Sequence, residues 1–319
     1  MKREDSVSFE TVLFGDVLNP EVGSMPSLTV ASPAKINLAL RVLGKRPDGY
    51  HDIFTLFQRI SLADRIIFRK TRRSGVRLSC TLPQVPLGPG NLICKAYELL
   101  RKETGLRGGI EVELIKNIPL GGGLGGGSSN AASALKALNS MYSLGLKSDE
   151  LIHLGKRLGA DVPFFLMETS RAIGRGRGDE LCALRGVSKR IPLLLVFFPE
   201  GLSTPAVYER YRKHCFKLKN PPFLTKVSAD VTMLSAFLSA KNLTSAAVLL
   251  CNDLMLSACQ IKPAIARVLS FLRTFTPACL MTGSGATVFA LAESVEKAGQ
   301  IGEKVSRKFG LITWTGSTD

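Results

Sequence analysis

The stretch from Pro119 to Asn130 constrains the fold most, because it reads Pro-Leu-Gly-Gly-Gly-Leu-Gly-Gly-Gly-Ser-Ser-Asn. It lies between a segment of alternating polarity, 110–115, and an alanine-rich helical pattern, 129–142. So many glycines cost conformational entropy unless the backbone needs unusual angles or approaches a ligand closely. A glycine loop that leads into a helix presents unpaired N–H groups and the positive end of the helix dipole, which together bind phosphate. The segment therefore predicts a phosphate-binding loop; the alternative, a flexible linker, fits poorly between such closely flanking elements.

The glycine segment matches neither of the two common nucleotide loops. A Walker loop requires a lysine followed by serine or threonine after its glycines, and no lysine follows here. Gly121, Gly123 and Gly126 match the dinucleotide pattern G-x-G-x-x-G, but a stretch saturated with glycine matches it by chance. That pattern also needs a strand ending in an acid about 20 residues further on, where residues 148–150 indicate the start of a helix. A dinucleotide fold is therefore disfavoured.

Length and composition favour a globular protein of two domains, with one large domain as the alternative. The chain has 319 residues, 45% apolar and 21% charged, which argues against wholesale disorder. Its longest strongly apolar stretch, 191–198, is far shorter than the roughly 20 residues that cross a bilayer, so no membrane span is expected. Seven scattered cysteines without a C-x-x-C pair, together with three histidines, favour reduced thiols over a zinc cluster.

The net charge of +16 suits an anionic partner. The basic excess is densest at 65–77 and again at Arg171, Arg175 and Arg177. Nucleic acid and phosphorylated small molecules are both open as partners. For the run 65–77 a solvated surface is the simpler alternative.

Periodicity predicts a mixture of strands and helices. The first strand is expected at 28–42 with a break around Pro33, and a later helix is expected to be capped by Ser148 and to end at Gly159. Further strands are expected at 54–68, 76–80, 110–115, 191–198 and 288–291. Further helices are expected at 91–104, 129–142, 231–240, 243–250 and 261–275, with a loop at 213–226.

Two small groups of polar residues are candidates for chemistry. Lys35 and Asn37 are two apart on a predicted strand and so face the same side, although a merely solvated pair is the alternative. Asp161 lies between a helix-ending glycine and an apolar Pro-Phe-Phe run, so we expect it to be partly buried. It could pair with a lysine for catalysis, or it could cap backbone amides.

Two further motifs are open to more than one interpretation. Tyr50 and His51 follow a Pro-Asp-Gly turn, where stacking on a base and hydrogen bonding to it are possible, as is a structural role. The segment Thr282–Gly285 is a second small glycine loop, which alone indicates only a turn.

Together these segments resemble the GHMP kinase superfamily, and within it the 4-diphosphocytidyl-2-C-methyl-D-erythritol kinase family. The resemblance spans residues 30–291, and its motifs occur in family order. They are SPAKINLAL, GKRPDGYHDIFTLFQRISLAD, NIPLGGGLGGGSSNAASALKALN, LGADVPFFL, LSTPAVY, CNDL and MTGSGATVFAL. The resemblance implies phosphorylation of the 2-hydroxyl of 4-diphosphocytidyl-2-C-methyl-D-erythritol, with ATP and Mg²⁺, in the non-mevalonate isoprenoid precursor pathway.

The resemblance also implies roles for individual residues. Asp161 would accept the alcohol proton, while Lys35 would orient Asp161 and offset developing charge; no magnesium ligand is assigned. Asn91 and Lys116 would lie around the adenine nucleoside. The ATP phosphate loop corresponds to Pro119, Leu120, Gly121, Gly122, Gly123, Leu124, Gly125, Gly126, Gly127, Ser128 and Ser129. The substrate side corresponds to Asn37, Tyr50, His51, Thr204, Tyr208, Gly283 and Gly285.

The fold implied by the resemblance is an α+β kinase of two domains with the active site between them. The first, at 28–187, would resemble ribosomal protein S5 domain 2 and bind ATP, and the second, at 188–319, would be ferredoxin-like. Residues 1–27 would form a poorly ordered extension. The expected protein is a cytoplasmic monomer or homodimer (plastid stroma in a plant or alga) that binds a small-molecule substrate but neither nucleic acid nor membrane.

The chain departs from the family pattern at Arg175 and Arg177, where many bacterial relatives carry Glu-Gly-Val-Gly and plant-like relatives Gly-Arg-Gly. Another GHMP-type kinase, of the homoserine or mevalonate type, is an alternative that the DGYHD motif disfavours. A basic nucleic-acid-binding protein with an S5-like fold is another. It would predict aromatic residues throughout 65–77, where only Phe68 occurs. A non-catalytic nucleotide-binding paralogue is disfavoured because Lys35, Asp161 and the glycine segment are all retained.

Overall fold

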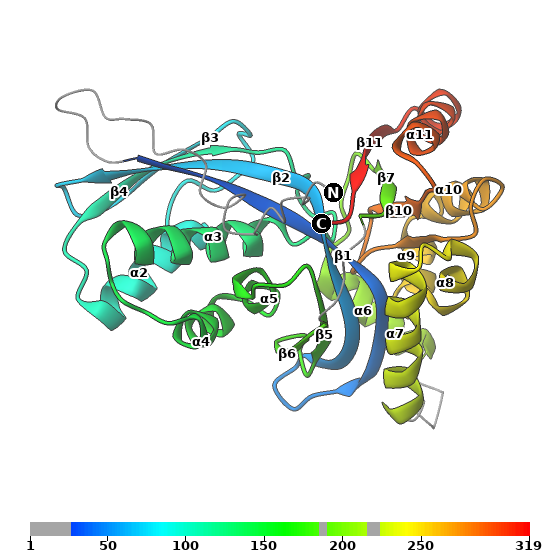
Figure 1. Cartoon of the computed structure of the whole chain (residues 1–319), viewed down its shortest axis with the longest axis horizontal. Coiled ribbons are helices and arrows are strands. Elements are labelled where there is room, and N and C mark those ends of the chain that lie inside the picture. Colours follow the sequence, from blue (N-terminus) through cyan, green and yellow to red (C-terminus); the bar gives the residue numbers. More distant parts are fainter. Residues whose placement is uncertain (1–26, 185–189, 216–223) are drawn as a thin grey trace, which may run out of the picture. The chain divides into compact units, whose positions relative to one another are not determined.

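The computed structural model describes residues 27–184, 190–215 and 224–319, and these form two compact units (Figure 1). The units interleave along the chain. Unit 1 holds the described residues up to Pro33 together with Ala63–Ile118 and Gly126–Glu168, and unit 2 holds Ala34–Leu62, Pro119–Gly125 and Thr169–Asp319. The long strands β1 (Ser27–Lys45) and β2 (His51–Thr71) each contribute to both units.

Unit 1 is a sheet with helices packed on it. Strand β4 (Gly109–Ile115) pairs antiparallel with β2 and parallel with β3 (Gly75–Cys80). Ile110, Val112 and Leu114 of β4 are buried, while the two glutamates between them are partly exposed, which confirms the alternation expected from the sequence. Figure 1 shows the unit's helices, which are α2 (Leu92–Thr104), α3 (Gly126–Met141), α4 (Ser148–Leu158) and α5 (Val162–Leu166).

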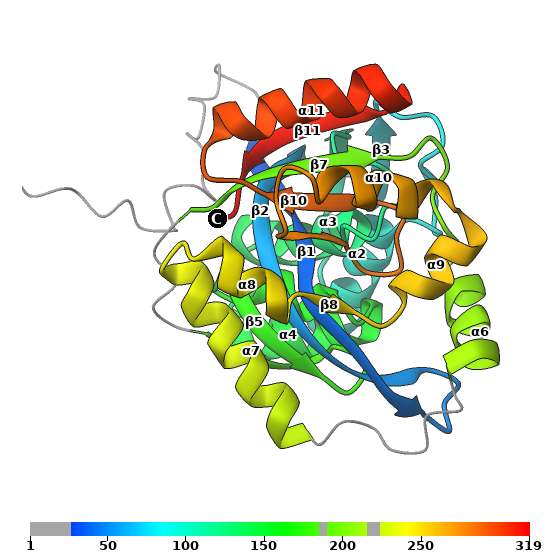
Figure 2. The same cartoon turned by 90° about the vertical axis from the view of Figure 1, so that its right-hand side faces the viewer.

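Unit 2 contains a second, antiparallel sheet with the strand order β11-β7-β10-β9. Figure 2 labels β11, β7 and β10 of this sheet. In chain order this is 4-1-3-2, the order of a ferredoxin-like sheet, so this part of the fold prediction is confirmed. The strands are β7 (Pro192–Phe197), β9 (Cys279–Met281), β10 (Val288–Leu291) and β11 (Ile312–Ser317). Two helices pack on the sheet, α10 (Ala264–Leu272) and α11 (Val295–Phe309).

The remaining elements of unit 2 extend the edges of β1 and β2. Strand β5 (Arg171–Arg175) pairs antiparallel with β2 and forms a hairpin with β6 (Glu180–Ala183), while β8 (Cys251–Asn252) pairs parallel with β1. The other helices are α6 (Thr204–Cys215), α7 (Leu224–Ser239), α8 (Leu243–Leu249) and α9 (Met255–Ile261).

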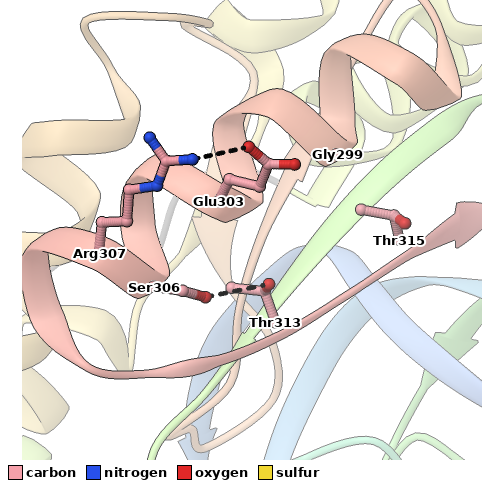
Figure 3. Close-up of a pocket in the computed structure, with 6 residues that line it drawn as sticks. All are labelled: Gly299, Glu303, Ser306, Arg307, Thr313 and Thr315. Atoms are coloured by element: carbon pink, nitrogen blue, oxygen red, sulfur yellow. Dashed lines mark hydrogen bonds and ion pairs between the residues drawn. The ribbon is translucent and has the colours of Figure 1, made fainter.

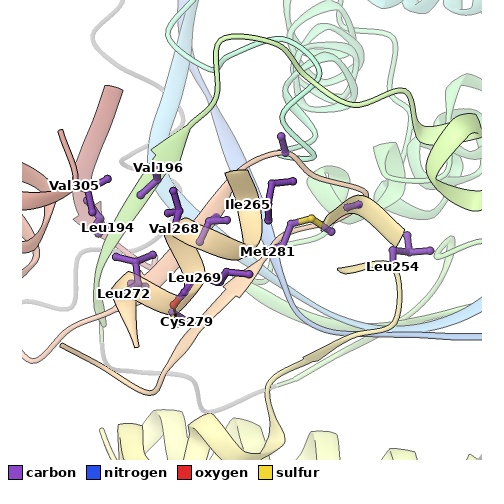
Figure 4. Close-up of a cluster of buried hydrophobic side chains, with 14 of the residues drawn as sticks. Leu194, Val196, Leu254, Ile265, Val268, Leu269, Leu272, Cys279, Met281 and Val305 are labelled. Atoms are coloured by element: carbon purple, nitrogen blue, oxygen red, sulfur yellow. Dashed lines mark hydrogen bonds between the residues drawn. The ribbon is translucent and has the colours of Figure 1, made fainter. Parts of the chain in front are cut away.

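The core of unit 2 lies between the antiparallel sheet and its helices. Figure 4 shows side chains of β7, α10 and α11 gathered there, including Leu194, Val268 and Val305, all fully buried. At about 1.5–3 kcal/mol for each fully buried aliphatic side chain, this cluster stabilises β9 and β10, the strands that flank the second glycine loop.

Several elements differ from the sequence expectation for identifiable reasons. Strand β1 continues through Pro33, because a proline is compatible with extended backbone and removes only one donor. Helix α4 begins at Ser148 instead of being capped by it, since Glu150 Oε2 accepts the N–H of Lys147 at 2.8 Å. The helix expected at 261–275 is shorter, because α10 begins after Pro263 and ends at Leu272, and the preceding α9 was not expected.

The loop expected at 213–226 is helical at both ends, because α6 runs to Cys215 and α7 begins at Leu224; residues 216–223 lie outside the described part. The expected extension lies almost entirely in residues 1–26, and the expected domain boundary coincides with 185–189. Residues 1–26 and 185–189 also lie outside the described part, so the expected domain limits at 27/28 and 187/188 stay predictions. Within the described ranges no helix is long and apolar enough to cross a bilayer. The six cysteines whose side chains are described are all free thiols.

Candidate active site

The expected site residues are divided between the two units, and each unit holds a coherent group. Unit 1 holds the start of α3 and Asp161. Unit 2 holds Lys35, the earlier part of the glycine segment and the whole expected substrate side.

Lys35 and Asn37 form a buried pair on β1. Lys35 Nζ donates to Asn37 Oδ1 at 2.8 Å, and the two residues are 4% and 2% exposed. The same-face prediction is confirmed, and the alternative of a solvated pair is wrong. The ammonium also lies 5.3 Å from the ring centroid of Phe57, which is buried on β2.

Asn37 connects three segments of unit 2. Its Nδ2 donates to Thr55 Oγ1 on β2 at 2.7 Å, and its backbone N–H donates to Thr282 Oγ1 at 2.9 Å. Thr282 opens the second glycine loop, so β1 is tied directly to that loop. The side chain beside Lys35 is thereby held in one orientation.

The first part of the glycine segment needs its glycines. Gly121, Gly123 and Gly125 have φ of 66°, 74° and 71°, the left-handed region that side chains disfavour. A Cβ on Gly123 would lie 2.6 Å from the carbonyl oxygen of Thr282, so the two glycine loops approach backbone to backbone. The backbone N–H of Lys35 donates to Leu124 O at 3.0 Å and fixes the loop to β1. The prediction that these glycines adopt unusual backbone angles is confirmed. The close approach that the structure shows is to the second glycine loop.

Helix α3 begins at Gly126, three residues before the expected start, because the left-handed conformation ends at Gly125. The first turn is therefore glycine and serine, small residues that leave the helix N-terminus open. The first four N–H groups of an α-helix have no partner within the helix, and with the helix dipole they form an anion site.

A buried network around Asp64, which the sequence reasoning did not single out, fixes both ends of the glycine segment. Asp64 Oδ1 accepts the backbone N–H groups of Asn117 and Ile118, each at 2.8 Å, just before the loop. Its Oδ2 accepts from Lys116 Nζ and from Asn130 Nδ2 in α3. Because the side chains of Asp64 and Lys116 are 0% and 3% exposed, this is a fully buried ion pair.

A chain of hydrogen bonds continues the network to the first turn of α3. Asn130 Nδ2 also donates to Ser32 Oγ at 3.0 Å, and Ser32 Oγ donates to Ser129 Oγ at 2.8 Å. The only sequence sign of Asp64 was its place in the ISLAD motif, and that of Asn130 its place at the end of the glycine segment.

The side chains of the two residues expected around the adenine nucleoside both interact with other groups of the protein. Asn91 caps α2, because its Oδ1 accepts the N–H of Ile93 at 2.9 Å while its Nδ2 donates to Pro86 O at 2.7 Å. Lys116 belongs to the buried ion pair with Asp64.

Asp161 lies directly before α5 and is half-buried, as expected. Its side chain makes no capping hydrogen bond to α5, so the capping alternative is wrong for that helix. A Cβ on nearby Gly159 would lie 3.8 Å from Ser128 Oγ, which places this segment beside the first turn of α3. Within unit 1, the segment that carries Asp161 therefore lies beside the last part of the expected phosphate loop, 126–129.

On the expected substrate side, His51 and Tyr208 stack, with ring centroids 4.6 Å apart and an angle of 26° between the planes. His51 Nε2 is buried and has no hydrogen-bond partner among the described residues. Burial, together with the charges of Arg212 and Lys45, lowers the pKa of His51, so the ring is neutral near pH 7. A neutral imidazole with an unsatisfied nitrogen is suited to a polar ligand edge.

The second glycine loop is held from several sides. Gly283 and Gly285 have φ of 56° and 88°, and Thr204 Oγ1 and Ser284 Oγ are 2.7 Å apart. Asn252, a further residue that the sequence reasoning did not single out, donates from Nδ2 to Met281 O and Gly283 O, both at 2.8 Å.

A surface pocket on α11 and β11 holds none of the expected site residues (Figure 3). It contains the Glu303–Arg307 ion pair at 3.4 Å, whose side chains are 70% and 80% exposed. Exposed ion pairs contribute little to stability. None of the residues that line this pocket has a buried polar side-chain atom without a hydrogen-bond partner.

Comparison with known proteins gives the family. Residues 91–169 match the GHMP kinases N terminal domain, and residues 234–311 match the GHMP kinases C terminal domain. A protein of Pelotomaculum thermopropionicum named 4-diphosphocytidyl-2-C-methyl-D-erythritol kinase is 38% identical over 281 residues, 88% of this chain and 94% of that protein. The chain belongs to the 4-diphosphocytidyl-2-C-methyl-D-erythritol kinase family of GHMP kinases.

Other relatives agree with this assignment. A Methylococcus capsulatus protein of the same name is 35% identical over 91% of this GHMP kinase and 92% of its own length. A solved structure of 4-(cytidine 5'-diphospho)-2C-methyl-D-erythritol kinase superimposes with a TM-score of 0.74 at 32% identity and covers 91% of this chain and 98% of its own. A homoserine kinase from Cytophaga hutchinsonii has a TM-score of 0.72 at 18% identity over 95% of this chain and 97% of its own, which shows the shared fold. The α+β, two-domain GHMP kinase fold is therefore confirmed.

Proposed function

We propose that this chain transfers the terminal phosphoryl group of ATP to the 2-hydroxyl of 4-diphosphocytidyl-2-C-methyl-D-erythritol, a step of non-mevalonate isoprenoid precursor synthesis. The observation that carries the proposal is the match to relatives of that name over nearly the full length of both chains. Lys35, Asp161 and the complete glycine segment are present in the matched region. GHMP kinases use ATP as the donor.

We propose that the glycine segment and the first turn of α3 bind the phosphates of ATP. The left-handed glycines support this role because they let the backbone approach a ligand, and the helix start supplies N–H donors. Asn91 and Lys116 would shape the nucleoside site through the segments they fix, since both side chains already have protein partners.

For the chemical step we propose Asp161 as the general base and Lys35 as the residue that orients it. Phosphoryl transfer passes through a loose transition state and asks the protein mainly for positioning and charge stabilisation. A carboxylate that takes the hydroxyl proton contributes roughly 10²–10⁴-fold. The half-buried Asp161 beside the start of α3 supports this role.

We propose that Mg²⁺ enters with the nucleotide. Within the described ranges no group of three or more histidine, cysteine, aspartate or glutamate side chains comes together, so a preformed protein cage is not the expected arrangement there. Mg²⁺ usually keeps water and substrate phosphates as ligands and takes only one or two carboxylates from the protein. Such binding needs no cluster of three protein ligands. When bound, the ion neutralises charge on the transferred phosphoryl group.

On the acceptor side we propose that Tyr50, His51 and Tyr208 receive the cytosine, with Asn37, Thr204, Gly283 and Gly285 around the rest of the substrate. The unsatisfied His51 Nε2 supports this assignment, because a hydrogen bond from the base would satisfy it.

The test is ADP release coupled to NADH oxidation, with Mg-ATP and 4-diphosphocytidyl-2-C-methyl-D-erythritol. We expect substrate-dependent release by the wild type and a loss of at least 100-fold in kcat for Asp161→Asn. The matched control is Glu303→Gln, which removes an exposed carboxylate and should keep full activity. Release with L-homoserine or mevalonate alone would assign the chain to another kinase activity.

A further inference from the structure

Two tight turns of unit 2 meet beside Tyr50. One joins β1 to β2, where Arg46 N–H donates to Tyr50 O at 2.8 Å and Tyr50 N–H donates to Asp48 Oδ1 at 3.1 Å. The other joins β5 to β6, and its Gly176 O accepts the N–H of Ile53 at 2.7 Å. The backbone of Tyr50 is thus fixed, while the residue as a whole stays 57% exposed.

Arg177 extends from the β5–β6 turn over the ring of Tyr50. Its guanidinium carbon lies 5.3 Å from the ring centroid, within the range of a cation–π contact. Arg177 Nη2 also donates to Asp179 Oδ2 at 2.8 Å, and the two side chains are 29% and 13% exposed. The hydrogen bond with Asp179 raises the pKa of Arg177, so the cation persists at every pH of interest.

The glycines on either side of Arg177 give the turn the conformation that places this side chain. Gly176 and Gly178 have φ of 64° and 98°, so both positions favour glycine. A Cβ on Gly178 would lie 3.3 Å from Ile53 Cδ1, so the turn is pressed against β2. The Gly-Arg-Gly-Arg-Gly sequence at 174–178 therefore places the Arg177 cation at a defined point.

Arg175 of the same hairpin provides a contrast. Its guanidinium lies 5.6 Å from the ring centroid of Phe54, but Phe54 is fully buried and cannot contact a ligand. Two arginines two residues apart therefore make the same kind of contact, one with an accessible ring and one with an inaccessible ring.

We propose that Arg177, held by Asp179, is a positioning and specificity-determining residue that fixes the ring of Tyr50 as a stacking platform for the cytidine diphosphate moiety of the acceptor substrate. This inference rests on the proposed function, because it takes Tyr50 as part of the acceptor site. The guanidinium holds one orientation of the ring before the substrate arrives, which reduces the ordering needed on binding. Its positive charge also favours a diphosphate over an uncharged alcohol.

The test compares steady-state kinetics of Arg177→Met, Arg177→Lys, Asp179→Asn and the control Arg175→Met. We expect Arg177→Met to raise KM for the cytidine diphosphate substrate at least about fivefold, and KM for ATP and kcat to change less than twofold. Asp179→Asn should raise the same KM. In Arg177→Lys this KM should lie between the values of the wild type and Arg177→Met, and in Arg175→Met it should equal that of the wild type.

Equal effects of Arg177→Met and Arg175→Met would overturn the inference in favour of a general charge effect, as would an unchanged KM in an active Arg177→Met enzyme. Calorimetric titration with cytidine diphosphate separates this inference from the proposed function. Binding that weakens in Arg177→Met supports the inference even if the wild type transfers no phosphoryl group. Equal binding by wild type and variant, or no binding by the wild type, overturns it.

Discussion

The buried Asp64–Lys116 pair allows a quantitative prediction, because it fixes both ends of the glycine segment. The Lys116 side chain is 3% exposed, so in Asp64→Ala we expect its ammonium to stay buried and to lose its carboxylate partner. Removing one partner of a buried ion pair costs about 3–5 kcal/mol. The backbone N–H of Ile118, also buried, loses its acceptor as well, at about 1–3 kcal/mol. Because these losses overlap, we expect unfolding to be easier by about 4 kcal/mol.

The assay is urea unfolding followed by far-UV circular dichroism. With an m value of about 3 kcal/mol/M, the midpoint should fall by roughly 1.3 M. Lys116→Met should lower the free energy of unfolding by less, about 2 kcal/mol, because the Asp64 carboxylate keeps three other hydrogen-bond donors. In the double variant Asp64→Ala/Lys116→Met, the loss in the free energy of unfolding should be at least about 1.5 kcal/mol smaller than the sum of the losses in the two single variants.

Arg157→Met is the matched control, because it breaks an ion pair with Glu103 whose side chains are about half exposed. We expect it to cost less than about 1 kcal/mol. If Asp64→Ala shifts the midpoint no more than this control, or if the two single variants add without coupling, the reasoning about the network is refuted.

Three further predictions concern the glycine segment, His51 and Lys35. Gly123→Ala should raise KM for ATP at least tenfold, because the new Cβ would lie 2.6 Å from Thr282 O. The control is Gly145→Ala, where the glycine has the same φ of 74° but open space around it; this variant should lose only stability, by about 1–2 kcal/mol. Because the folded-state pKa of His51 is lowered, its contribution to stability is present above the ordinary value of about 6.5 and is lost as pH falls through the folded pKa. Thermal unfolding between pH 7 and pH 5 should therefore show a larger loss for the wild type than for His51→Gln, and equal slopes would contradict the assignment. Lys35→Met should lower kcat at least about 100-fold while the circular dichroism spectrum stays native; an active variant would remove Lys35 from the proposed chemistry.

Local pattern was sufficient for the features whose causes are local. The left-handed glycines, the alternation along β4 and the same-face pair Lys35 and Asn37 all follow from backbone periodicity and side-chain size. The start of α3 was placed three residues late, because a glycine gives no sign of whether its φ will be helical or left-handed.

Features that depend on distant contacts could not be predicted in the same way. Asp64 meets partners 52 to 66 positions away in the sequence, and Asn252 meets Met281 and Gly283 from 29 and 31 positions away. Nothing in the neighbourhood of either residue indicates these partners. The contact of Arg177 with Tyr50 likewise depends on the pairing of β5 with β2.

The most direct test of the central claim is to identify the product by ³¹P nuclear magnetic resonance. Wild-type protein is incubated with Mg-ATP and 4-diphosphocytidyl-2-C-methyl-D-erythritol, and the spectrum is followed over time. We expect a new phosphomonoester resonance to grow as the terminal phosphorus of ATP declines, while the diphosphate resonances of the substrate persist. Inorganic phosphate alone, or an unchanged spectrum from folded protein, would contradict the account.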